Sequence, residues 1–437
     1  MRCRSRALAG TLVLLAVAAC SDTPVQPGAD LPLSPARGGL GQSDDVMPGE
    51  VLLKVAGGAD VQAIAVGHGL EVVGVGYRGA FHILRGPVGN ERAAAATLRL
   101  DPAVVWAEPN FLRQTTAIDP KLWAFYNPGG LNMKYTSGKS SGQNLPTSYA
   151  SILDADEDNV GGYASGGVDV VIGSIDTGVD FNHPEFTGRL IPGQDWYNND
   201  NDPTDDDGHG SHTTGTMAGS TVGVAGVSGA AAHVKVYVQK VCGRRGCPTS
   251  AIVNAIRAAA DQTGMVAMNL SLGGSSESQA EKDAISYATG KGVLVIASAG
   301  NSGSGTVSCP ACDPNAISVA STTWRDEKAS YSQYGPGLDI SAPGGSCYSN
   351  TTPEGCIYSA YKGGGYAWLQ GTSMAAPQVT GTAAIVASKT GLRGAALRSR
   401  LEGSADDKGP AGYDQTFGNG RLNSYRAVMN TPLGAGQ

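Results

Sequence analysis

Continuous apolar runs alternate with amphipathic stretches over most of the chain. Beyond about residue 117, apolar runs rich in β-forming residues recur as VDVVIGSID, HVKVYVQKV, MVAMNLSL, GVLVIASAG, AISVAST and LDISAPG. Between several of them lie helical patterns such as TSAIVNAIRAAADQTG and QAEKDAISYATGKG. Because apolar strands that alternate with helices favour a buried parallel sheet, the pattern predicts an α/β fold with helices on both faces. Ligands of such sheets gather beyond the carboxyl ends of the strands.

A different pattern precedes this region, in residues 48–114. Its predicted strands are EVLLKV, LEVVGVGY, AFHILRG and AVVWAEPNFLR, and its predicted helices are ADVQAIAVGHG and ERAAAATLRL. The order β-α-β-β-α-β predicts a small α+β unit of the ferredoxin-like type. The glycines of residues 74–79 match a GxGxxG pattern, but a strand follows them where a dinucleotide site requires a helix. We therefore exclude a dinucleotide site there.

The N-terminus has the features of an export signal. Residues 1–19 join the basic MRCRSR to an apolar stretch that is too short for a comfortable membrane span. VAAC, which ends at Cys20, resembles a bacterial lipobox and so implies a lipid on Cys20; a plain signal peptide is the alternative. Residues 20–47 are rich in Pro, Gly and Asp, as in a flexible tether. We expect a protein exported from a bacterial cell, either secreted or tethered to a membrane as a lipoprotein.

Composition narrows the class of protein. The chain has 437 residues, of which 63 are Gly and only 16% are charged, a balance typical of a globular protein rather than a disordered one. The net charge of -7 argues against nucleic acid as the main partner.

Six cysteines lie beyond the signal region, and an even number in an exported chain predicts three disulfides. The close spacings favour local pairs, although six cysteines allow 15 arrangements. The favoured pairs are Cys242 with Cys247, Cys309 with Cys312, and Cys347 with Cys356. A zinc site is the alternative, and it is weak because CGRRGC lacks the spacing of a second CxxC.

Polar residues of four kinds stand at or near the predicted strand ends. Asp176 follows VVIGSI, Asn301 follows GVLVIAS, His209 lies in DGHGSHTTGTMAG, and Ser373 heads the helix of GTSMAAPQVTG. A serine hydroxyl is a weak nucleophile that needs a base, for which histidine is best suited near neutral pH. A carboxylate fixes the tautomer of that histidine, and an amide can donate to an oxyanion. Each of these residues alone has a plainer interpretation; Ser373, for example, could be a helix N-cap. Together, the four residues indicate a serine hydrolase.

The motifs resemble those of the subtilisin-like serine peptidases, or subtilases. VIGSIDTGVDFNHPEF is similar to the Asp motif of that family, DGHGSHTTGTMAG to its His motif and GTSMAAPQVTG to its Ser motif. MNLSLGG and ASAGNSG resemble its substrate strand and oxyanion segment, and GNGRLN resembles its C-terminal segment. The resemblance runs from about residue 117 to 430; its Ser motif is very specific, whereas DTG alone is weak. It implies a subtilisin-like fold and a serine endopeptidase that works through an acyl-enzyme.

The resemblance assigns a role to each matched residue. Asp176 would orient His209, His209 would act first as base and then as acid, and Ser373 would attack the scissile carbonyl. Asn301 would donate its amide to the oxyanion, together with the backbone N–H of Ser373. An extended substrate would pair as an added strand with four residues, Ser271, Leu272, Gly273 and Gly274.

Residues 48–114 resemble the I9-type inhibitory propeptide of the same family. The resemblance implies a zymogen in which this unit assists folding, blocks the active site and is removed by self-processing between Leu112 and Asp119. A stable domain that is never cut off is the alternative. We expect residues 117–430 to form the catalytic domain of a monomer whose partners are protein or peptide substrates and its own propeptide.

The chain departs from the family pattern at three places. Ser211, Thr213 and Thr214 replace Thr, Val and Ala of the usual His motif, and Gln378 stands where the family usually has His. The CxxC motif of residues 309–312 falls where family members build part of the primary specificity pocket, which a disulfide could rigidify or narrow. The resemblance therefore leaves specificity loosely defined, as broad with a preference for apolar side chains before the cut.

Calcium is the metal that the sequence suggests. Residues 195–207 hold six Asp, and dense oxygen ligands in a loop suit calcium. Glu185 matches a calcium-ligand position of the family, and no cofactor is expected for the chemistry itself. A solvated acidic loop is the alternative.

Two other functions compete with a serine endopeptidase. A non-catalytic scaffold or binding protein on the same fold would have no need of the four matched residues. A metallohydrolase would use His209, His212 and the Asp cluster, but HxxH lacks the Glu and the spacing of a zinc protease.

Overall fold

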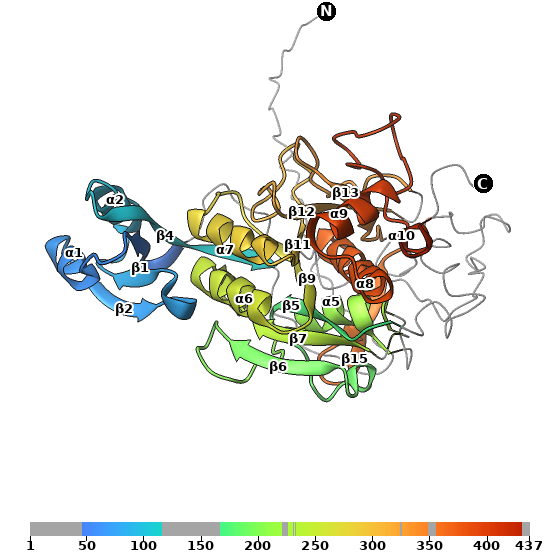
Figure 1. Cartoon of the computed structure of the whole chain (residues 1–437), viewed down its shortest axis with the longest axis horizontal. Coiled ribbons are helices and arrows are strands. Elements are labelled where there is room, and N and C mark those ends of the chain that lie inside the picture. Colours follow the sequence, from blue (N-terminus) through green and yellow to red (C-terminus); the bar gives the residue numbers. More distant parts are fainter. Residues whose placement is uncertain are drawn as a thin grey trace, which may run out of the picture.

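The computed structural model describes residues 46–115, 167–220, 226–229, 231, 233–323, 326–347 and 355–430. The predicted signal, the predicted tether up to residue 45, and the start of the predicted catalytic domain up to residue 166 lie outside the described residues; residues 46 and 47 of the tether already belong to the first strand. Two units follow one another along the chain: an N-terminal unit (residues 46–115) and a larger unit (residues 167–430) (Figure 1).

Seven parallel strands form the central sheet of the larger unit. Their order is β13-β12-β11-β9-β5-β7-β6, and every neighbouring pair is parallel. The strands are β5 (Val170–Asp176), β6 (Leu190–Asp195), β7 (Val234–Lys240), β9 (Met265–Leu270), β11 (Leu294–Ser298), β12 (Ile317–Thr322) and β13 (Ile340–Pro343). Six of the seven are the apolar runs of the sequence; β6 begins Leu-Ile-Pro-Gly and gave no such run.

Helices cover both faces of this sheet, as the apolar strands require. One face packs against α6 (Thr249–Asp261) and α7 (Gln279–Gly290). The other packs against α5 (His209–Ala218), α8 (Thr372–Thr390), α9 (Gly394–Gly403) and α10 (Ser424–Met429). Along β5 the side chains alternate between the two cores, with Ile172 in one and Ile175 in the other. The predicted α/β fold is confirmed.

The N-terminal unit has the predicted element order. Its elements are β1 (Val46–Val55), α1 (Val61–Gly67), β2 (Glu71–Val75), the short 3-10 turn η1 (Tyr77–Gly79), β3 (His82–Arg85), α2 (Glu91–Leu98) and β4 (Val104–Thr115). The strands pair in the order β4-β1-β3-β2 and all pairs are antiparallel. A strand, not an α-helix, follows the GxGxxG stretch, so the geometry of a dinucleotide site is absent from this described part of the chain.

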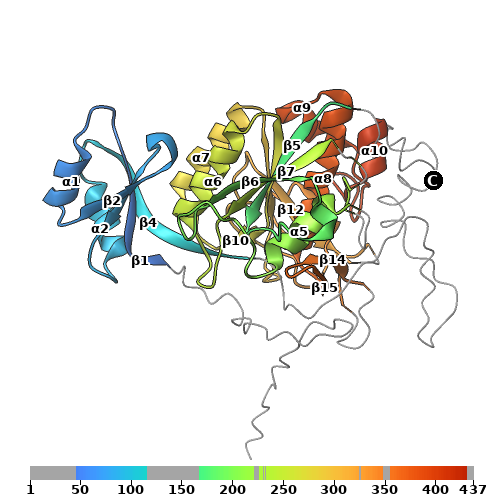
Figure 2. The same cartoon turned by 90° about the horizontal axis from the view of Figure 1, so that it is seen from below.

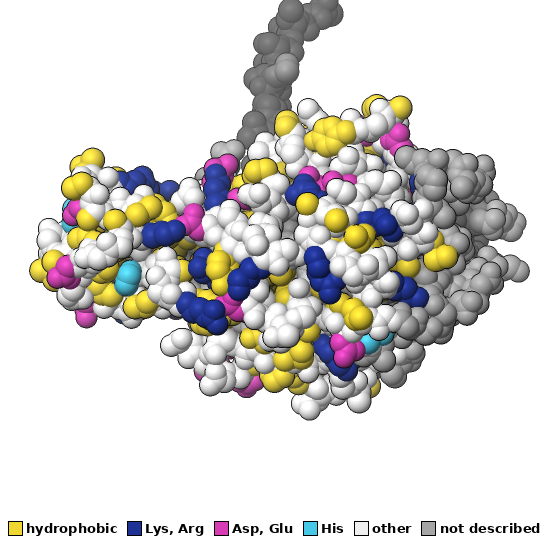
Figure 3. All heavy atoms as spheres, in the orientation of Figure 1, with side chains coloured by type: hydrophobic (Ala, Val, Ile, Leu, Met, Phe, Trp, Pro, Cys, Tyr) yellow, Lys and Arg dark blue, Asp and Glu magenta, His cyan; other side chains and the backbone are white. Residues whose placement is uncertain are grey.

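The N-terminal unit packs against the side of the larger unit that α6 and α7 form (Figures 1 and 2). Leu52 and Phe81 are buried in the same core as these two helices. Apolar side chains of the unit such as Val66, Val88 and Leu100 stay exposed. Figure 3 shows hydrophobic side chains on the surface of this unit. Since a unit of this size builds only a small core of its own, its contact with α6 and α7 adds to its burial.

Strand β4 continues beyond its own sheet into the larger unit. Leu112 and Arg113 pair with β8 (Cys247–Pro248), and Gln114 and Thr115 pair with β10 (Leu272–Gly273), both antiparallel. The last residues of the N-terminal unit therefore lie as a strand between two segments of the larger unit.

A hairpin that the sequence pattern did not reveal packs on α5. It consists of β14 (Ile357–Tyr361) and β15 (Gly365–Leu369). The ring of Tyr358 stacks on that of Tyr366 and makes a tilted contact with that of Trp368. Its strands are short, and aromatic and polar residues mix in them without a clear alternation.

All three predicted disulfides are formed. Their sulfur atoms join Cys242 to Cys247, Cys309 to Cys312, and Cys347 to Cys356. The zinc alternative is therefore wrong for the CxxC motif, since both of its sulfurs are engaged in a disulfide.

Candidate active site

The carboxyl edge of the central sheet gathers the candidate residues. Asp176 is the last residue of β5, and Ser271 and Asn301 follow closely on β9 and β11. His209 is the first residue of α5, and Ser373 lies in the first turn of α8. These two helices pack against each other, so residues from distant parts of the chain meet at one edge.

Asp176 and His209 form a buried pair. His209 Nδ1 lies 2.6 Å from Asp176 Oδ1, and both side chains are almost completely buried. Since a carboxylate only accepts, Nδ1 donates and the neutral ring leaves Nε2 as an acceptor. That Nε2 is buried and has no hydrogen-bond partner among the described residues. Burial is the largest single influence and would lower the pKa of His209, but the charge and hydrogen bond of Asp176, together with the charges of Asp207 and Asp205, raise this pKa above its usual value.

Glycines let α5 begin this close to the end of β5. Gly208, just before the helix, has φ +113°, and a Cβ there would lie 2.2 Å from the ring of Tyr361. A Cβ on Gly210 would lie 2.0 Å from the carbonyl oxygen of Gly178. Side chains at these two positions would push His209 away from Asp176.

Ser373 is not the N-cap of its helix. The N-cap is Gly371 and α8 starts at Thr372, so the plainer interpretation of Ser373 is wrong. Pro377, four residues on, has no N–H for the carbonyl of Ser373. The freed carbonyl instead accepts from Ser271 Oγ at 2.8 Å, and Ser373 Oγ lies 3.2 Å from the carbonyl of Ser271. The two serines therefore fix each other across the site.

Asn301 is oriented by the residue before Ser373. Its Oδ1 accepts from the backbone N–H and the hydroxyl of Thr372, each at 2.9 Å. This fixes which way the amide faces and directs Nδ2 away from Thr372. Nδ2 is buried without a hydrogen-bond partner among the described residues, so an amide donor is available beside Ser373.

The three departures in the His motif all place hydroxyls on polar partners. Thr213 Oγ1 donates to Asp176 Oδ2 at 3.2 Å, and Thr214 Oγ1 lies 2.9 Å from Ser174 Oγ. Ser211 Oγ donates to Asp205 Oδ2 at 2.6 Å. The substitutions are accommodated, and that of Thr213 adds a donor to the carboxylate that faces His209.

Comparison with known proteins identifies this arrangement. Residues 167–420 match the profile of the Subtilase family, Peptidase_S8. The chain is 37% identical over 350 residues to the thermophilic serine proteinase of Bacillus sp. (strain AK1), covering 80% of this chain and 78% of that protein. The chain belongs to the subtilase family. Thermitase of Thermoactinomyces vulgaris is 39% identical over 259 residues, which cover 59% of this subtilase and 88% of thermitase.

Solved structures agree on the fold. Fervidolysin from Fervidobacterium pennivorans, a keratinolytic enzyme related to subtilisin, superposes with a TM-score of 0.68 at 24% identity, covering 91% of this subtilase and 63% of fervidolysin. A lanthipeptide protease superposes with a TM-score of 0.57 at 26% identity, covering 65% and 94% of the two chains. The protein is a subtilisin-like serine endopeptidase, as the sequence predicts.

Two other candidates of the sequence lie elsewhere in this subtilase. His212 Nε2 donates to the carbonyls of Ile357 and Ala367, which ties α5 to the β14–β15 hairpin. Burial lowers the pKa of His212 to about 3, so its ring is neutral, and its Nε2 is engaged by these two carbonyls. His209, His212 and the Asp cluster do not form a metal-binding group among the described residues, so the metallohydrolase hypothesis lacks support. Glu185 is fully buried and accepts from the Tyr366 hydroxyl at 3.0 Å.

Sequence reasoning missed two residues that hold the site together. Thr372 orients Asn301, and Asp205 accepts hydrogen bonds from both sides of the Asp176–His209 pair. Thr372 lies inside the Ser motif and could have been noticed from its position. Asp205 is one of six Asp in an acidic loop, and nothing in the sequence separates it from the others.

Proposed function

We propose that Asp176, His209 and Ser373 are the catalytic residues of this endopeptidase. The contact that carries the proposal is the buried 2.6 Å pair of His209 and Asp176, which leaves Nε2 as the proton acceptor. Ser373 Oγ would exchange its contact with the Ser271 carbonyl for His209 Nε2, give up its proton and attack the substrate carbonyl. His209 would then donate that proton to the leaving amine, and water would hydrolyse the acyl-enzyme in the same way. This chemistry needs no cofactor.

Asn301 would stabilise the charge that develops on the substrate oxygen. Its unpartnered Nδ2 and the backbone N–H groups at the start of α8 are the donors for this role. Because Thr372 already holds the amide in place, no reorganisation is needed when the oxyanion forms. Such a donor contributes about 2.7–4 kcal/mol to transition-state stabilisation.

The N-terminal unit would act as a propeptide that occupies the substrate site. Thr115 and Gln114 pair with Leu272 and Gly273, the strand at which we predict that a substrate binds. The residue before Leu272 is Ser271, whose carbonyl contacts Ser373 Oγ. This register supports a cut within two residues of Thr115, which we propose at Thr115–Thr116 or Thr116–Ala117, inside the interval that the sequence predicts. Residues 116–166 lie outside the described part of the chain.

Two side chains of β4 support docking of the propeptide by capping helices of the larger unit. The buried carboxylate of Glu108 accepts from Ser278 Oγ at 2.5 Å and from the N–H groups of Gln279 and Ala280 at the start of α7. Asn110 Oδ1 accepts from the Ser250 N–H at 2.9 Å in the first turn of α6. Helix N-termini attract such acceptors because their first N–H groups lack helical partners.

Export is the setting that the three disulfides and the basic-apolar N-terminus support. Residues 1–19 and the predicted lipid site at Cys20 lie outside the described residues. Within the described part of the chain, no helix combines the length and apolar character needed to cross a bilayer. Lipid attachment at Cys20 stays a prediction, which mass spectrometry of the cellular protein and its Cys20→Ser variant would test.

Calcium is not supported by the acidic loop as it stands. Both oxygens of Asp195 accept hydrogen bonds from Tyr197 and Asn198, and the ammonium of Lys240 lies against Asp206. No group of three or more His, Cys, Asp or Glu side chains arranged for a metal occurs among the described residues. The role of Glu185 as a calcium ligand stays a prediction.

The proposed roles are tested with the full chain without its signal, as wild type and as Ser373→Ala. We expect the wild type to lose its N-terminal unit, to begin at Thr116 or Ala117 and to digest casein. Ser373→Ala should keep its intact mass and leave casein uncut, since it lacks the nucleophile. If both proteins stay full length and neither cuts casein, the assigned roles are wrong.

A further inference from the structure

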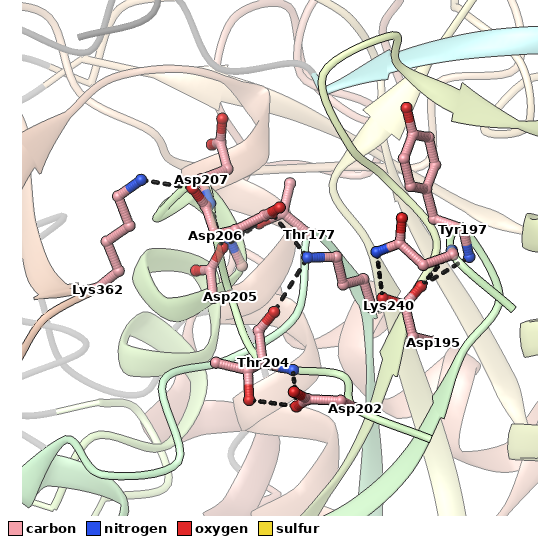
Figure 4. A network of polar contacts seen from close by, with 12 residues as sticks. Thr177, Asp195, Tyr197, Asp202, Thr204, Asp205, Asp206, Asp207, Lys240 and Lys362 are labelled. Atoms are coloured by element: carbon pink, nitrogen blue, oxygen red, sulfur yellow. Dashed lines mark hydrogen bonds and ion pairs between the residues drawn. The ribbon is translucent and has the colours of Figure 1, made fainter. Parts of the chain in front are cut away.

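Residues 195–207, the acidic loop, connect β6 to the start of α5 and border the Asp176–His209 pair. Asp200, Asp202, Asp206 and Asp207 have exposed side chains. Asp205 instead points inward and is buried. Figure 4 shows it between Thr177 and the helix that His209 begins.

Asp205 accepts five hydrogen bonds from two elements of the site. Its Oδ1 accepts from Thr177 Oγ1 at 2.8 Å and from the N–H groups of Gly208 at 2.8 Å and Asp207 at 3.0 Å. Its Oδ2 accepts from the N–H of Ser211 at 2.8 Å and from its hydroxyl at 2.6 Å. All five partners donate and so favour the ionised carboxylate, but burial outweighs them and raises the pKa of Asp205 to about 6.

These contacts join the two residues of the candidate pair through their neighbours. Thr177 directly follows Asp176, and Gly208 directly precedes His209. Thr177 Oγ1 also accepts from the Gly210 N–H at 2.8 Å, so the hydroxyl links Asp205 to the first turn of α5 a second time. Movement of the Asp205 carboxylate would therefore move the end of β5 relative to the start of α5.

Lys240 holds the loop that presents Asp205. It is the last residue of β7, and its side chain is buried although it is charged. Its Nζ donates to the carbonyl of Thr204 at 3.0 Å and to Asp206 Oδ1 at 2.7 Å, on either side of Asp205 (Figure 4). A buried ammonium needs such partners to offset its desolvation. The loop thus has an internal cation where the sequence suggested calcium.

We propose that Asp205 is a positioning residue for the Asp176–His209 pair and that Lys240, as the internal cation of the acidic loop, holds Asp205 in place. The proposal rests on the proposed function, since it assumes that this pair activates Ser373. Asp205 touches no reacting atom; it acts by fixing the distance between the carboxylate and the imidazole. Its charge also acts on His209, whose pKa is governed by burial, by Asp176, and by Asp207 and Asp205.

The test compares Asp205→Asn with Asp202→Asn in the full chain. Asparagine keeps the shape of Asp205, but its NH₂ group is a donor. In either orientation of the amide, this donor would face the N–H or O–H donors that now bind the carboxylate. We expect kcat on a peptide substrate to fall by about 100-fold with KM nearly unchanged, because a small misplacement of catalytic groups has that cost. The acidic limb of kcat/KM should move to lower pH, since Asp205→Asn removes a buried carboxyl group whose own pKa is raised to about 6 and a charge that raises the pKa of His209.

Asp202→Asn is the matched control. It removes the same charge from the same loop, but Asp202 is exposed and accepts only from Thr204 among the described residues. It should retain wild-type kcat and pH profile. Lys240→Met should lower kcat less than Asp205→Asn does. Lys235 lies on the same strand, and its ammonium donates to the Gly188 carbonyl and not to the acidic loop. Lys235→Met should therefore keep the kcat of the wild type.

A folding defect is separated from a positioning defect by Thr177→Val. This variant keeps the Asp205 charge and removes one of the hydrogen bonds to it. As a single substitution it should lower kcat, but combined with Asp205→Asn it should lower kcat little further. For a variant that matures too slowly to yield active enzyme, the rate of self-cleavage of the full chain is measured in place of kcat. If Asp205→Asn keeps the kcat and acidic limb of the wild type, the positioning role is wrong while the catalytic roles stand. If the wild type shows no Ser373-dependent hydrolysis, both proposals fall.

Discussion

Two histidines on one helix show how residue-scale environment decides chemistry. His209 and His212 lie three positions apart in α5, and both are buried. His209 faces the carboxylate of Asp176, whereas His212 faces two backbone carbonyls of the hairpin. A charged partner favours the imidazolium, and burial among neutral groups disfavours it. The two pKa values are therefore shifted in opposite directions.

This difference predicts two separate titrations, measured by NMR of the ¹⁵N-labelled histidines in full-length Ser373→Ala. His209 should titrate above its usual value of 6.5, and His212 should stay neutral down to a pH of about 3. Because His209 must be neutral to accept a proton, activity of the wild type should be lost as the pH falls through the raised pKa. His212→Gln identifies the second signal. A His209 pKa below 6.5 would contradict the pairing with Asp176.

At the scale of elements, helix ends decide how the two units meet. The helices α6 and α7 both present their N-termini to β4, whose Glu108 and Asn110 supply acceptors. At the other end of α6, Asp261 accepts from the Tyr77 hydroxyl at 2.8 Å and pairs with Arg78 of the N-terminal unit. The unit thus holds both ends of one helix and one end of the next.

Glu108→Ala should weaken this contact because three donors lose a charged acceptor. The expected loss is about 1.5–3 kcal/mol of docking free energy, the usual value for hydrogen bonds to a charged group. After processing, the cut unit should separate from the enzyme faster on size exclusion, and casein hydrolysis should appear sooner. Glu71→Ala, an exposed carboxylate on β2, is the control and should behave as wild type. Equal release rates in both variants would show that the cap does not contribute.

At the scale of the whole molecule, three disulfides close local loops. Cys242–Cys247 borders β8, and Cys309–Cys312 lies beside the strand that we propose to bind substrate, since the backbone of Cys309 pairs with Gly274 at 2.8 and 2.9 Å. Cys347–Cys356 closes the longest of the three loops, with a sequence separation of nine. Their contribution to folding stability should therefore differ with loop length.

Replacing Cys347 and Cys356 by Ser should lower the free energy of unfolding by about 3 kcal/mol in the chain-entropy model, against about 2 kcal/mol for Cys309 and Cys312, whose loop is shorter. The measurement is denaturant unfolding of full-length Ser373→Ala, in which processing cannot change the molecule being compared. Equal or reversed losses would mean that native contacts, not loop closure, set the contribution of each disulfide.

Residue order and local pattern were sufficient to predict six of the seven strands of the central sheet and to identify the candidate residues. Apolar runs such as that of residues 265–270 favour a strand that is buried on both faces of a parallel sheet. The residues at the carboxyl ends of such strands then lie at one edge of the sheet. The short cysteine spacings likewise left local pairing as the favoured arrangement.

Only the tertiary structure decided the contacts between segments far apart in sequence. Six Asp look alike in the acidic loop, and Asp205 differs only because folding brings Thr177 and the start of α5 to it. Lys240 becomes the cation of that loop only when β7 lies beside it. The pairing of residues 112–115 with two separate segments of the larger unit has the same origin. The pattern of apolar residues indicates which side chains of one segment are buried. The contacts described here depend on which segments lie side by side in the folded protein.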